Sequence, residues 1–365
     1  MSRDSLYGEP IVWQGRCRAL AVPAAMKAVA AGSSVVSAVT LCYAVVVAKS
    51  LGAPVGGMVL FAGWCATMAL LAWRLPIWWR SQIEYLVTAR RVVWRRGRLL
   101  RSIEIRQISY ALVRWSSRDS KVGDLVLVRA VPTGALRRTL SLTLDDVEAP
   151  DRLLALIRGV EPSAPLGSGG RPLAQRLDPG ERVLWSAAPV STPWTLRRLA
   201  TAVTGAAMVF AFVRLVERLV PRLVGLVQAL PPGIAAFLLV AVSLTILLLF
   251  AGATGVTYAA FVRPSRLTRQ TRYFVTDARV LIRRGGEELS LDRSRIAYVI
   301  DAPSRRLHDV FLVLDGPQAR ALAPSGAFGE EDHGVDGLRP VFASIDDADT
   351  VGRILAEREL EKRAA

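Results

Sequence analysis

Few side chains in this 365-residue sequence are suited to nucleophilic or metal chemistry. Its two histidines are His308 and His333, and its three cysteines, Cys17, Cys42 and Cys65, occur singly. This spacing offers neither a CxxC metal site nor a disulfide framework. Two histidines also leave little material for a catalytic triad or a proton relay. We therefore predict no metal site and no cofactor, and we interpret the cysteines as small apolar packing residues.

Common catalytic motifs are absent as well. The sequence contains no P-loop, no G-x-S-x-G, no H-E-x-x-H and no kinase-like set. The acidic pairs Asp145-Asp146 and Asp346-Asp347 precede predicted helices, whose positive dipole ends favour carboxylates. A third acidic group, Glu330-Glu331-Asp332, is interpreted as a solvated loop, with a weak divalent-ion site as the alternative. We predict that the chain is not an enzyme.

The chemistry that the sequence does concentrate is positive charge. The formal net charge is +16. From Arg80 to Arg158 there are 16 basic and 8 acidic residues, whereas Arg263 to Ala365 holds 17 of each. The first stretch includes a dense cluster that forms the candidate lipid-headgroup site: Arg90, Arg91, Arg95, Arg96, Arg98 and Arg101.

Three kinds of role can explain this cluster. A basic segment beside a membrane is attracted to anionic phospholipid headgroups by about 1 kcal/mol per charge. The same arginines could instead serve membrane topology and solubility alone. Nucleic acid is not expected as a partner, because no aromatic residues are interleaved with the arginines as a stacking platform requires.

Uncharged blocks of membrane-crossing length precede this cluster. No charged residue occurs from Ala28 to Ala48 or from Ser50 to Trp73. About 20 apolar residues suffice to cross a hydrocarbon core of about 30 Å. A second pair of blocks is interrupted by Pro231-Pro232-Gly233. We predict four membrane spans, at about 28–48, 53–73, 199–220 and 234–256.

The basic residues that flank these spans predict the orientation. Arginines and lysines precede the first and third spans and follow the second and fourth, whereas Lys49 alone occupies the first turn. The positive-inside rule then places both termini in the cytoplasm of a multi-pass cell-membrane protein. Arg214 and Glu217, at the outer end of the third span, are spaced to pair on one helix face. We interpret them as interfacial residues, with an ion or proton path as the alternative.

The sequence is also internally duplicated. YLVTARRV from Tyr85 returns as YFVTDARV from Tyr273, and GEPIVW from Gly8 returns as GERVLW from Gly180. Each membrane hairpin lies between its copies of these two motifs. The chain therefore consists of two tandem units of one family.

Short β-prone runs follow each hairpin. In the first copy they are 84–88, 91–94, 99–105, 109–115, 125–131 and 139–144, and a helix follows near Pro150. In the second copy they are 271–276, 278–283, 288–291, 296–300 and 310–314, with a helix over about 347–361. Residues 315–340 carry a Gly- and acid-rich insertion. Each copy thus predicts a strand meander closed by one helix.

The combination of GE-x-x-x-W, a two-helix membrane hairpin, Y-x-V-T-x-x-R-V and a closing helix resembles bacterial membrane-anchored PH-like domain proteins. Both copies match, so the resemblance covers nearly the whole chain. It implies a PH-like fold for each soluble domain: a bent antiparallel sheet or partly open barrel with a C-terminal helix. The second copy departs at Asp277-Ala278 and His308-Asp309, which makes equal function of the two domains doubtful. The resemblance implies no catalytic activity.

The fold class expected is membrane helical hairpins plus α+β. Residues 1–22 form an entry segment, 23–80 the first hairpin, 81–160 the first PH-like domain and 161–178 a linker. Residues 179–198 form the second entry segment, 199–262 the second hairpin and 263–365 the second PH-like domain. The function expected is non-catalytic display of two cytoplasmic domains that bind anionic lipid, a protein partner or a second copy. The alternative is an accessory subunit of an export or envelope-stress system that acts by protein docking.

Overall fold

The computed structural model describes residues 5–6, 8–18, 22–52, 54–130, 139–161, 167, 169–190, 196–229, 232–304, 307–314 and 338–364. It divides into two units. A helical unit comprises Ala21–Trp79 and Trp194–Arg266. A β unit comprises Met1–Leu20, Arg80–Pro193 and Leu267–Ala365. Both predicted β-rich domains therefore belong to one compact unit.

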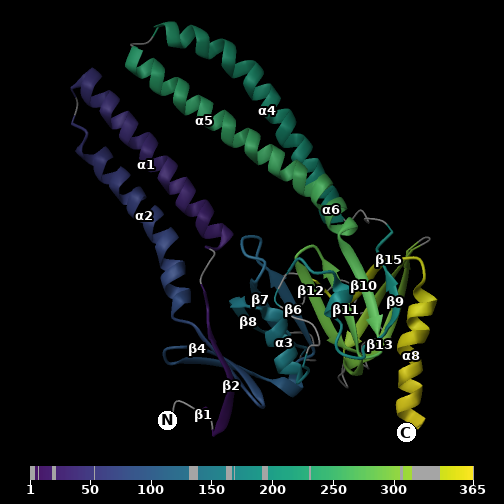
Figure 1. Ribbon diagram of the computed structural model, residues 1–365. Helices are drawn as coiled ribbons and strands as arrows, with labels where there is room; N and C mark the ends of the chain where they lie inside the picture. Colours follow the sequence, from purple (N-terminus) through teal and green to yellow (C-terminus); the bar gives the residue numbers. More distant parts are fainter. Residues whose placement is uncertain are drawn as a thin grey trace. The chain divides into compact units, whose positions relative to one another are not determined.

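The helical unit contains two helix pairs (Figure 1). The first is α1 (Ala24–Leu51) with α2 (Gly56–Ser81), and the second is α4 (Leu196–Ala229) with α5 (Pro232–Thr257). A π turn at Tyr258–Val262 leads from α5 into α6 (Arg263–Arg269). Within the described residues, four helices are long and apolar enough to cross a membrane: Ala25–Ser50, Gly56–Ser81, Arg198–Leu219 and Thr245–Arg269. This finding confirms, by length and composition, the prediction of four helices able to cross a membrane.

Small residues lie where the helices of each pair approach. Ser37 Oγ of α1 donates a 2.8 Å hydrogen bond to the carbonyl oxygen of Ala62 in α2. In the second pair, a Cβ added at Gly205 would lie 3.2 Å from the Thr257 hydroxyl oxygen. Small side chains allow membrane helices to pack closely. Further along α4, Arg214 and Glu217 form the predicted ion pair at 3.6 Å.

Within its described residues, the first repeat supplies eight strands and one helix to the β unit. A five-stranded antiparallel sheet has the order β1 (Ser5–Leu6), β2 (Glu9–Arg16), β3 (Glu84–Thr88), β4 (Arg91–Arg96) and β5 (Leu99–Glu104). It is followed by β6 (Tyr110–Trp115), β7 (Val122–Ala130), β8 (Thr139–Glu148) and α3 (Pro150–Arg158). All six predicted strands are present, but β1 and β2 were not predicted. Strand β2 pairs with β1 and also with β3, which comes only after the whole α1–α2 hairpin.

The second repeat follows the same order. It begins with β9 (Val183–Ala187), which was also not predicted, and continues with β10 (Thr271–Thr276), β11 (Arg279–Arg284) and β12 (Glu287–Asp292). A three-stranded sheet of β13 (Ile296–Ser304), β14 (Leu307–Leu314) and β15 (Val341–Ile345) precedes α8 (Ala348–Ala364). Three antiparallel sheets with helices thus give the α+β class that we expected.

The two repeats share one sheet, which we call the seam sheet. Its order is β8-β7-β6-β12-β11-β10-β9, so β6 of the first repeat pairs with β12 of the second. The antiparallel register opposes Glu287 to Arg114 and Ser290 to Ala111. Four consecutive residues of β6, Tyr110 to Val113, are buried, so this strand is covered on both faces. The strand pair makes the two repeats one folded body.

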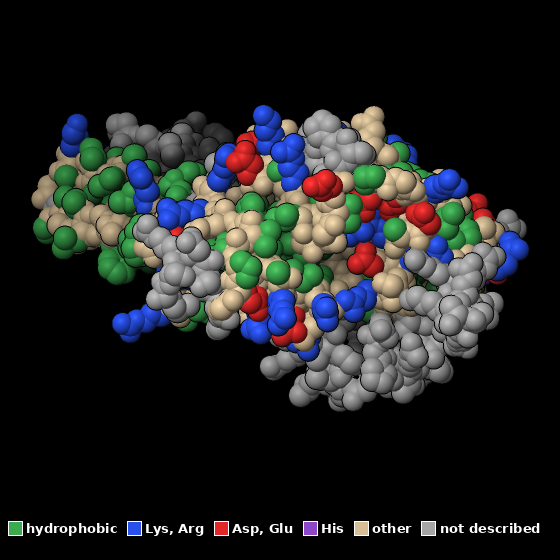
Figure 2. Space-filling model, turned by 60° about the horizontal axis from the view of Figure 1, so that its bottom comes forward, with side chains coloured by type: hydrophobic (Ala, Val, Ile, Leu, Met, Phe, Trp, Pro, Cys, Tyr) green, Lys and Arg blue, Asp and Glu red, His purple; other side chains and the backbone are tan. Residues whose placement is uncertain are grey.

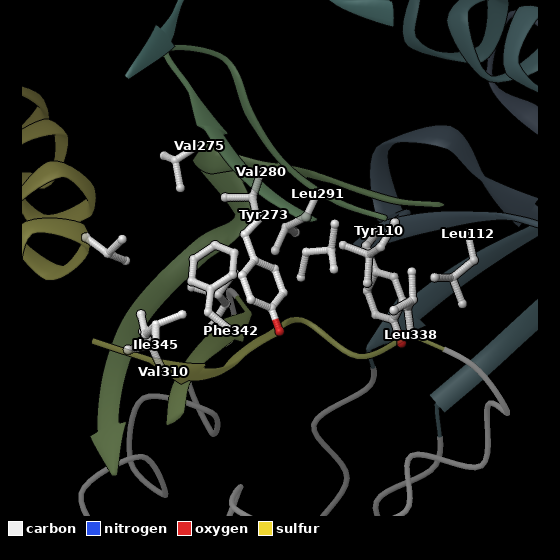
Figure 3. Close-up of a cluster of buried hydrophobic side chains, with 14 of the residues drawn as sticks. Tyr110, Leu112, Tyr273, Val275, Val280, Leu291, Val310, Leu338, Phe342 and Ile345 are labelled. Atoms are coloured by element: carbon white, nitrogen blue, oxygen red, sulfur yellow. The ribbon is translucent and has the colours of Figure 1, made fainter. Parts of the chain in front are cut away.

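A hydrophobic core crosses this seam (Figure 3). Tyr110 and Leu112 of the first repeat belong to the same cluster as Tyr273 and Phe342 of the second. The rings of Tyr273 and Phe342 meet edge-on at 5.2 Å between centroids. Trp185, the tryptophan of the GE-x-x-x-W motif, packs on Phe342 at 5.4 Å. Burial of this shared cluster stabilises both repeats together.

A tyrosine clasp occurs at equivalent places in both repeats. The Tyr85 hydroxyl donates to the carbonyl of Asp145 and accepts from its backbone N–H. Tyr273 makes the same two bonds with Ala343. The next residue has a positive φ in both cases, 50° at Asp146 and 53° at Ser344. Each of those two backbone N–H groups donates to an aspartate, Asp124 or Asp309. The predicted duplication therefore extends to the details of the fold.

Candidate functional site

The β4–β5 hairpin is an exposed basic element of the first repeat. Two residues, Gly97 and Arg98, connect the strands, because Arg96 pairs directly with Leu99 in the antiparallel register. Gly97 has a φ of 55°, a left-handed conformation that suits glycine in a tight turn. We call Arg95 through Arg101 the hairpin tip.

Two leucines lie exposed among the arginines of the hairpin tip. The exposed fractions are 62% for Leu99 and 43% for Leu100. Arg95, Arg98 and Arg101 are exposed as well. The Arg101 guanidinium lies over the Trp94 ring, 5.8 Å from its centroid. Exposed apolar residues surrounded by cationic side chains are suited to bind a surface that is both apolar and negatively charged.

Carboxylates are scarce around this tip. Among the described residues, no carboxylate lies within ion-pair distance of Arg95, Arg98 or Arg101. Glu84 is opposite Arg95 in the sheet, but its carboxylate pairs with Arg16 at 3.0 Å. The tip therefore keeps its positive charge available for an external partner.

The remaining members of the predicted six-arginine cluster lie at the other end of β4. Arg90 is exposed in the β3–β4 turn. Arg91 is half-buried and faces Glu9 at 3.6 Å and Glu104 at 3.9 Å. Five residues of extended chain separate β4's two ends by about 17 Å. The structure thus brings Arg95, Arg96, Arg98 and Arg101 together but not Arg90 and Arg91.

Arg91 has a structural counterpart in the second repeat, which explains the repeated motifs. Arg279 contacts both carboxylate oxygens of Glu181, at 3.0 Å from Nε and 3.0 Å from Nη2. The Thr276 hydroxyl donates a hydrogen bond to Glu181 and accepts one from the Arg279 backbone N–H. In the first repeat, Thr88 donates to Glu9 in the same way. Each repeat thus uses the same three side chains, the Glu of G-E and the Thr and Arg of V-T-x-x-R. They connect the segment at the start of the repeat, which contains Glu9 or Glu181, to the strand hairpin that follows.

A second charged constellation lies at the junction of the repeats and is buried. Arg176 donates to Glu288 at 2.7 Å, and its guanidinium lies 4.9 Å from the centroid of the Trp115 ring. Their exposed fractions are 7% for Arg176 and 9% for Glu288. Burial raises the pKa of Glu288, while the neighbouring Arg176 and Arg283 lower it. These closed contacts are suited to holding the repeats together.

The predicted linker takes part in this junction. Arg176 belongs to its 3-10 turn, Leu173–Arg176. The Arg283 guanidinium of the second repeat donates to the backbone carbonyl oxygen of Gly169 at 3.0 Å. A Cβ added at Gly169 would lie 2.8 Å from the Trp115 ring. Residues 162–166 and 168 of the linker lie outside the described part of the chain.

A buried acidic group lies beside the first tyrosine clasp. Burial, reinforced by the negative charge of Asp124, raises the pKa of Asp145 to about 6. Arg80 approaches Asp146 at 3.8 Å and opposes this shift. Within the described residues, no group of three His, Cys, Asp or Glu side chains could hold a metal ion. These aspartates order the β7–β8 region, where Asp124 accepts from the Asp146 N–H.

The other candidate residues lie apart from the hairpin tip. His308 pairs with Asp301 at 2.8 Å in the second repeat. Cys17 is buried, Cys42 is exposed and Cys65 is intermediate, and none of these three forms a disulfide. His333 and Glu330-Glu331-Asp332 lie outside the described residues.

Figure 2 shows one face of the molecule, on which Lys and Arg side chains are interspersed with Asp and Glu. Charge alone therefore does not single out the hairpin tip. Its distinguishing features are the adjacent exposed leucines and the absence of an ion-pair partner for three arginines among the described residues. The site predicted from the sequence includes the arginines of the tip but not Leu99 and Leu100. The signal available was the unbroken run R-R-G-R-L-L-R, in which two apolar residues follow a glycine turn.

Comparisons with known proteins found no family model, no curated protein and no solved structure that matches this chain.

Proposed function

We propose that the chain is a non-catalytic integral membrane protein whose cytoplasmic β unit contains two PH-like domains, and that the hairpin tip binds anionic phospholipid headgroups. The order of elements supports the PH-like assignment. Each repeat has an entry strand, three strands joined by tight turns, three further strands and a closing helix. The basic flanks of the spans support the cytoplasmic orientation.

The observation that carries the lipid assignment is the exposed Leu99-Leu100 pair within the arginine-rich tip. Arginines near an anionic surface each contribute about 1 kcal/mol. Exposed leucines can add apolar burial at the boundary between headgroups and acyl chains. The second repeat has Glu287 and Glu288 where the first has Leu99 and Leu100. In the second repeat this position is therefore acidic and paired with β6, whereas in the first repeat it is apolar, exposed and flanked by arginines.

The test uses the full chain in nanodiscs that contain or lack anionic lipid. An environment-sensitive fluorophore is attached to Leu99→Cys in a Cys42→Ala, Cys65→Ala background. We expect a blue-shifted emission in anionic discs that high salt reverses. A label at the exposed residue Ser117 serves as the position control.

Charge reversal then separates lipid binding from the protein-docking alternative. Arg95, Arg98 and Arg101 are changed together to Glu and compared with an equal change at three exposed arginines elsewhere, Arg152, Arg182 and Arg353. Lipid binding predicts loss of the blue shift for the first set alone. An emission that never depends on anionic lipid would reject the proposal and favour an accessory subunit that docks on proteins.

A further inference from the structure

Arginines follow the second membrane hairpin where its uncharged stretch ends. No charged residue occurs from 223 to 262, and Arg263 is the first charge after it. Helix α6 presents Arg263, Arg266 and Arg269 as exposed side chains. The sequence has no Asp or Glu from 218 to 276, and the ion pairs of the described residues include none of these three arginines. Their positive charge is therefore available to an anion from outside the chain.

The π turn between α5 and α6 orients these arginines. In it, the Arg263 backbone N–H donates to the carbonyl oxygen of Tyr258, one residue further back than in an α-helix. One additional residue rotates the following helix by about 100°. The Arg198 guanidinium, in the first turn of α4, donates through Nε to the carbonyl oxygen of Ala260 at 3.0 Å. Ala260 is buried, whereas Arg263 and Arg266 are exposed, so the turn packs on α4 while the two arginines lie at the surface.

The first repeat has apolar residues at the same place. Helices α2 and α6 end 188 residues apart, which is also the offset between the two Y-x-V-T motifs. This offset aligns Leu75 with Arg263 and Trp78 with Arg266. The first repeat thus combines a basic hairpin tip with an apolar helix end, whereas the second combines an acidic strand hairpin with a basic helix end.

We propose that Arg263 and Arg266 form a second headgroup site, the helix-end site, which binds the phosphate group of an anionic phospholipid beside the second membrane hairpin. In the second repeat, the strand position that corresponds to the hairpin tip holds Glu287 and Glu288 and is paired with β6. That repeat therefore contacts headgroups through its helix end instead. This site goes beyond the hairpin tip, because both arginines belong to the helical unit.

The spacing and the neighbours of the two arginines suit a phospholipid. Side chains three residues apart on a helix have Cβ atoms about 5–6 Å apart, so both arginines can reach one phosphate group. Each guanidinium can donate two parallel hydrogen bonds to phosphate oxygens. Tyr258 and Phe261 are also exposed and lie about one turn nearer the span. Tyrosine is enriched at the headgroup level of bilayers, and the phenylalanine beside it adds apolar contact for acyl chains, which a soluble phosphate lacks.

Native mass spectrometry of the full chain tests this site by counting retained lipids. The chain is equilibrated with equal amounts of anionic phosphatidylglycerol and zwitterionic phosphatidylcholine in detergent micelles. The test variant is Arg263→Gln with Arg266→Gln. The matched control is Arg218→Gln with Arg222→Gln, which changes two exposed arginines further along α4. The same comparison in a chain with the charge-reversed hairpin tip separates failure of this site from failure of the tip.

We expect the unmodified chain to retain phosphatidylglycerol in preference to phosphatidylcholine. The test variant should lower this preference roughly 30-fold, since each arginine near an anionic surface contributes about fivefold. The control variant should leave it unchanged, and the effect should persist with the charge-reversed tip. An unchanged preference in the test variant, or an equal loss in the control, would overturn the proposal. So would displacement of the lipid by glycerol 3-phosphate, because the site would then bind a soluble phosphate.

A second measurement needs no substitution at the site. Phosphatidylglycerol with a photoreactive group near its headgroup is crosslinked to the unmodified chain in nanodiscs, and the labelled peptides are identified. We expect labelling of residues 258–269 that excess unlabelled phosphatidylglycerol suppresses and excess phosphatidylcholine does not. Equal suppression by both lipids, or no labelling of these residues, would contradict an anionic-lipid site at the helix end.

Discussion

The buried pair between Arg176 and Glu288 predicts that one substitution destabilises both repeats. In a Glu288→Ala variant, Arg176 keeps its charge but loses the carboxylate 2.7 Å away. Only 7% of Arg176 is exposed, so water can compensate little of this loss. Removing one partner of a buried ion pair costs about 3–5 kcal/mol. Opening of the seam sheet should therefore become roughly 10²- to 10⁴-fold more frequent.

Hydrogen exchange of the full chain in nanodiscs measures this opening. Peptides over β6 in the first repeat and β12 in the second should lose protection by similar factors, because these strands pair. The matched control is Glu84→Ala, whose partner Arg16 is largely exposed and whose loss should cost about 1 kcal/mol or less. A combined Arg176→Met, Glu288→Leu variant should recover much of the protection, since it removes both charges of the pair while Asp151 and Arg283 keep hydrogen bonds to backbone groups. Loss of protection in β12 with β6 unchanged would refute a cooperative seam.

Three further predictions follow from the β unit. Tyr273→Phe removes both bonds of the second clasp to Ala343 and should lower the free energy of unfolding by about 1–3 kcal/mol, measured by thermal unfolding. Asp145 has a pKa of about 6 in the fold, above its ordinary value, so the folded state binds more protons between about pH 4 and 6. Stability should therefore fall as pH rises through this window, and an Asp145→Asn variant that kept the same slope would contradict this assignment. Gly169→Ala places a Cβ 2.8 Å from the Trp115 ring and should displace that ring. We expect faster amide hydrogen exchange in the linker, whereas a Gly57→Ala control, which has no atom within 4 Å of the added Cβ, should leave the exchange unchanged.

The elements that the sequence predicts well are those with a local signal. Uncharged blocks of about 20 residues indicate the membrane helices regardless of how they pack. Strands β3 and β10 were predicted with their observed bounds because the repeated Y-x-V-T motif and the following turns delimit them. The second membrane pair was less well delimited, because α4 continues through Pro221 to Ala229. In membrane helices generally, neighbouring helices and polar side chains can satisfy a backbone group that proline leaves open.

The seam sheet could not be predicted in this way, because β6 and β12 are far apart in the sequence and neither strand carries a pairing signal of its own. One signal was available in retrospect: all four residues from Tyr110 to Val113 are apolar, whereas a half-buried strand alternates. The candidate site was predicted in part. The sequence cluster joined six arginines, but a strand places its two ends apart, so Arg91 fastens the fold while Arg95, Arg98 and Arg101 face outward.

Depth of the hairpin tip relative to the bilayer tests the proposed function most directly. A spin label at Leu100→Cys, in the Cys42→Ala, Cys65→Ala background, is measured in nanodiscs for relaxation by a water-soluble agent and by oxygen. With anionic lipid we expect protection from the water-soluble agent and access to oxygen, and with neutral lipid the reverse. A label that remains fully accessible to the water-soluble agent in both lipids would contradict a lipid-binding tip.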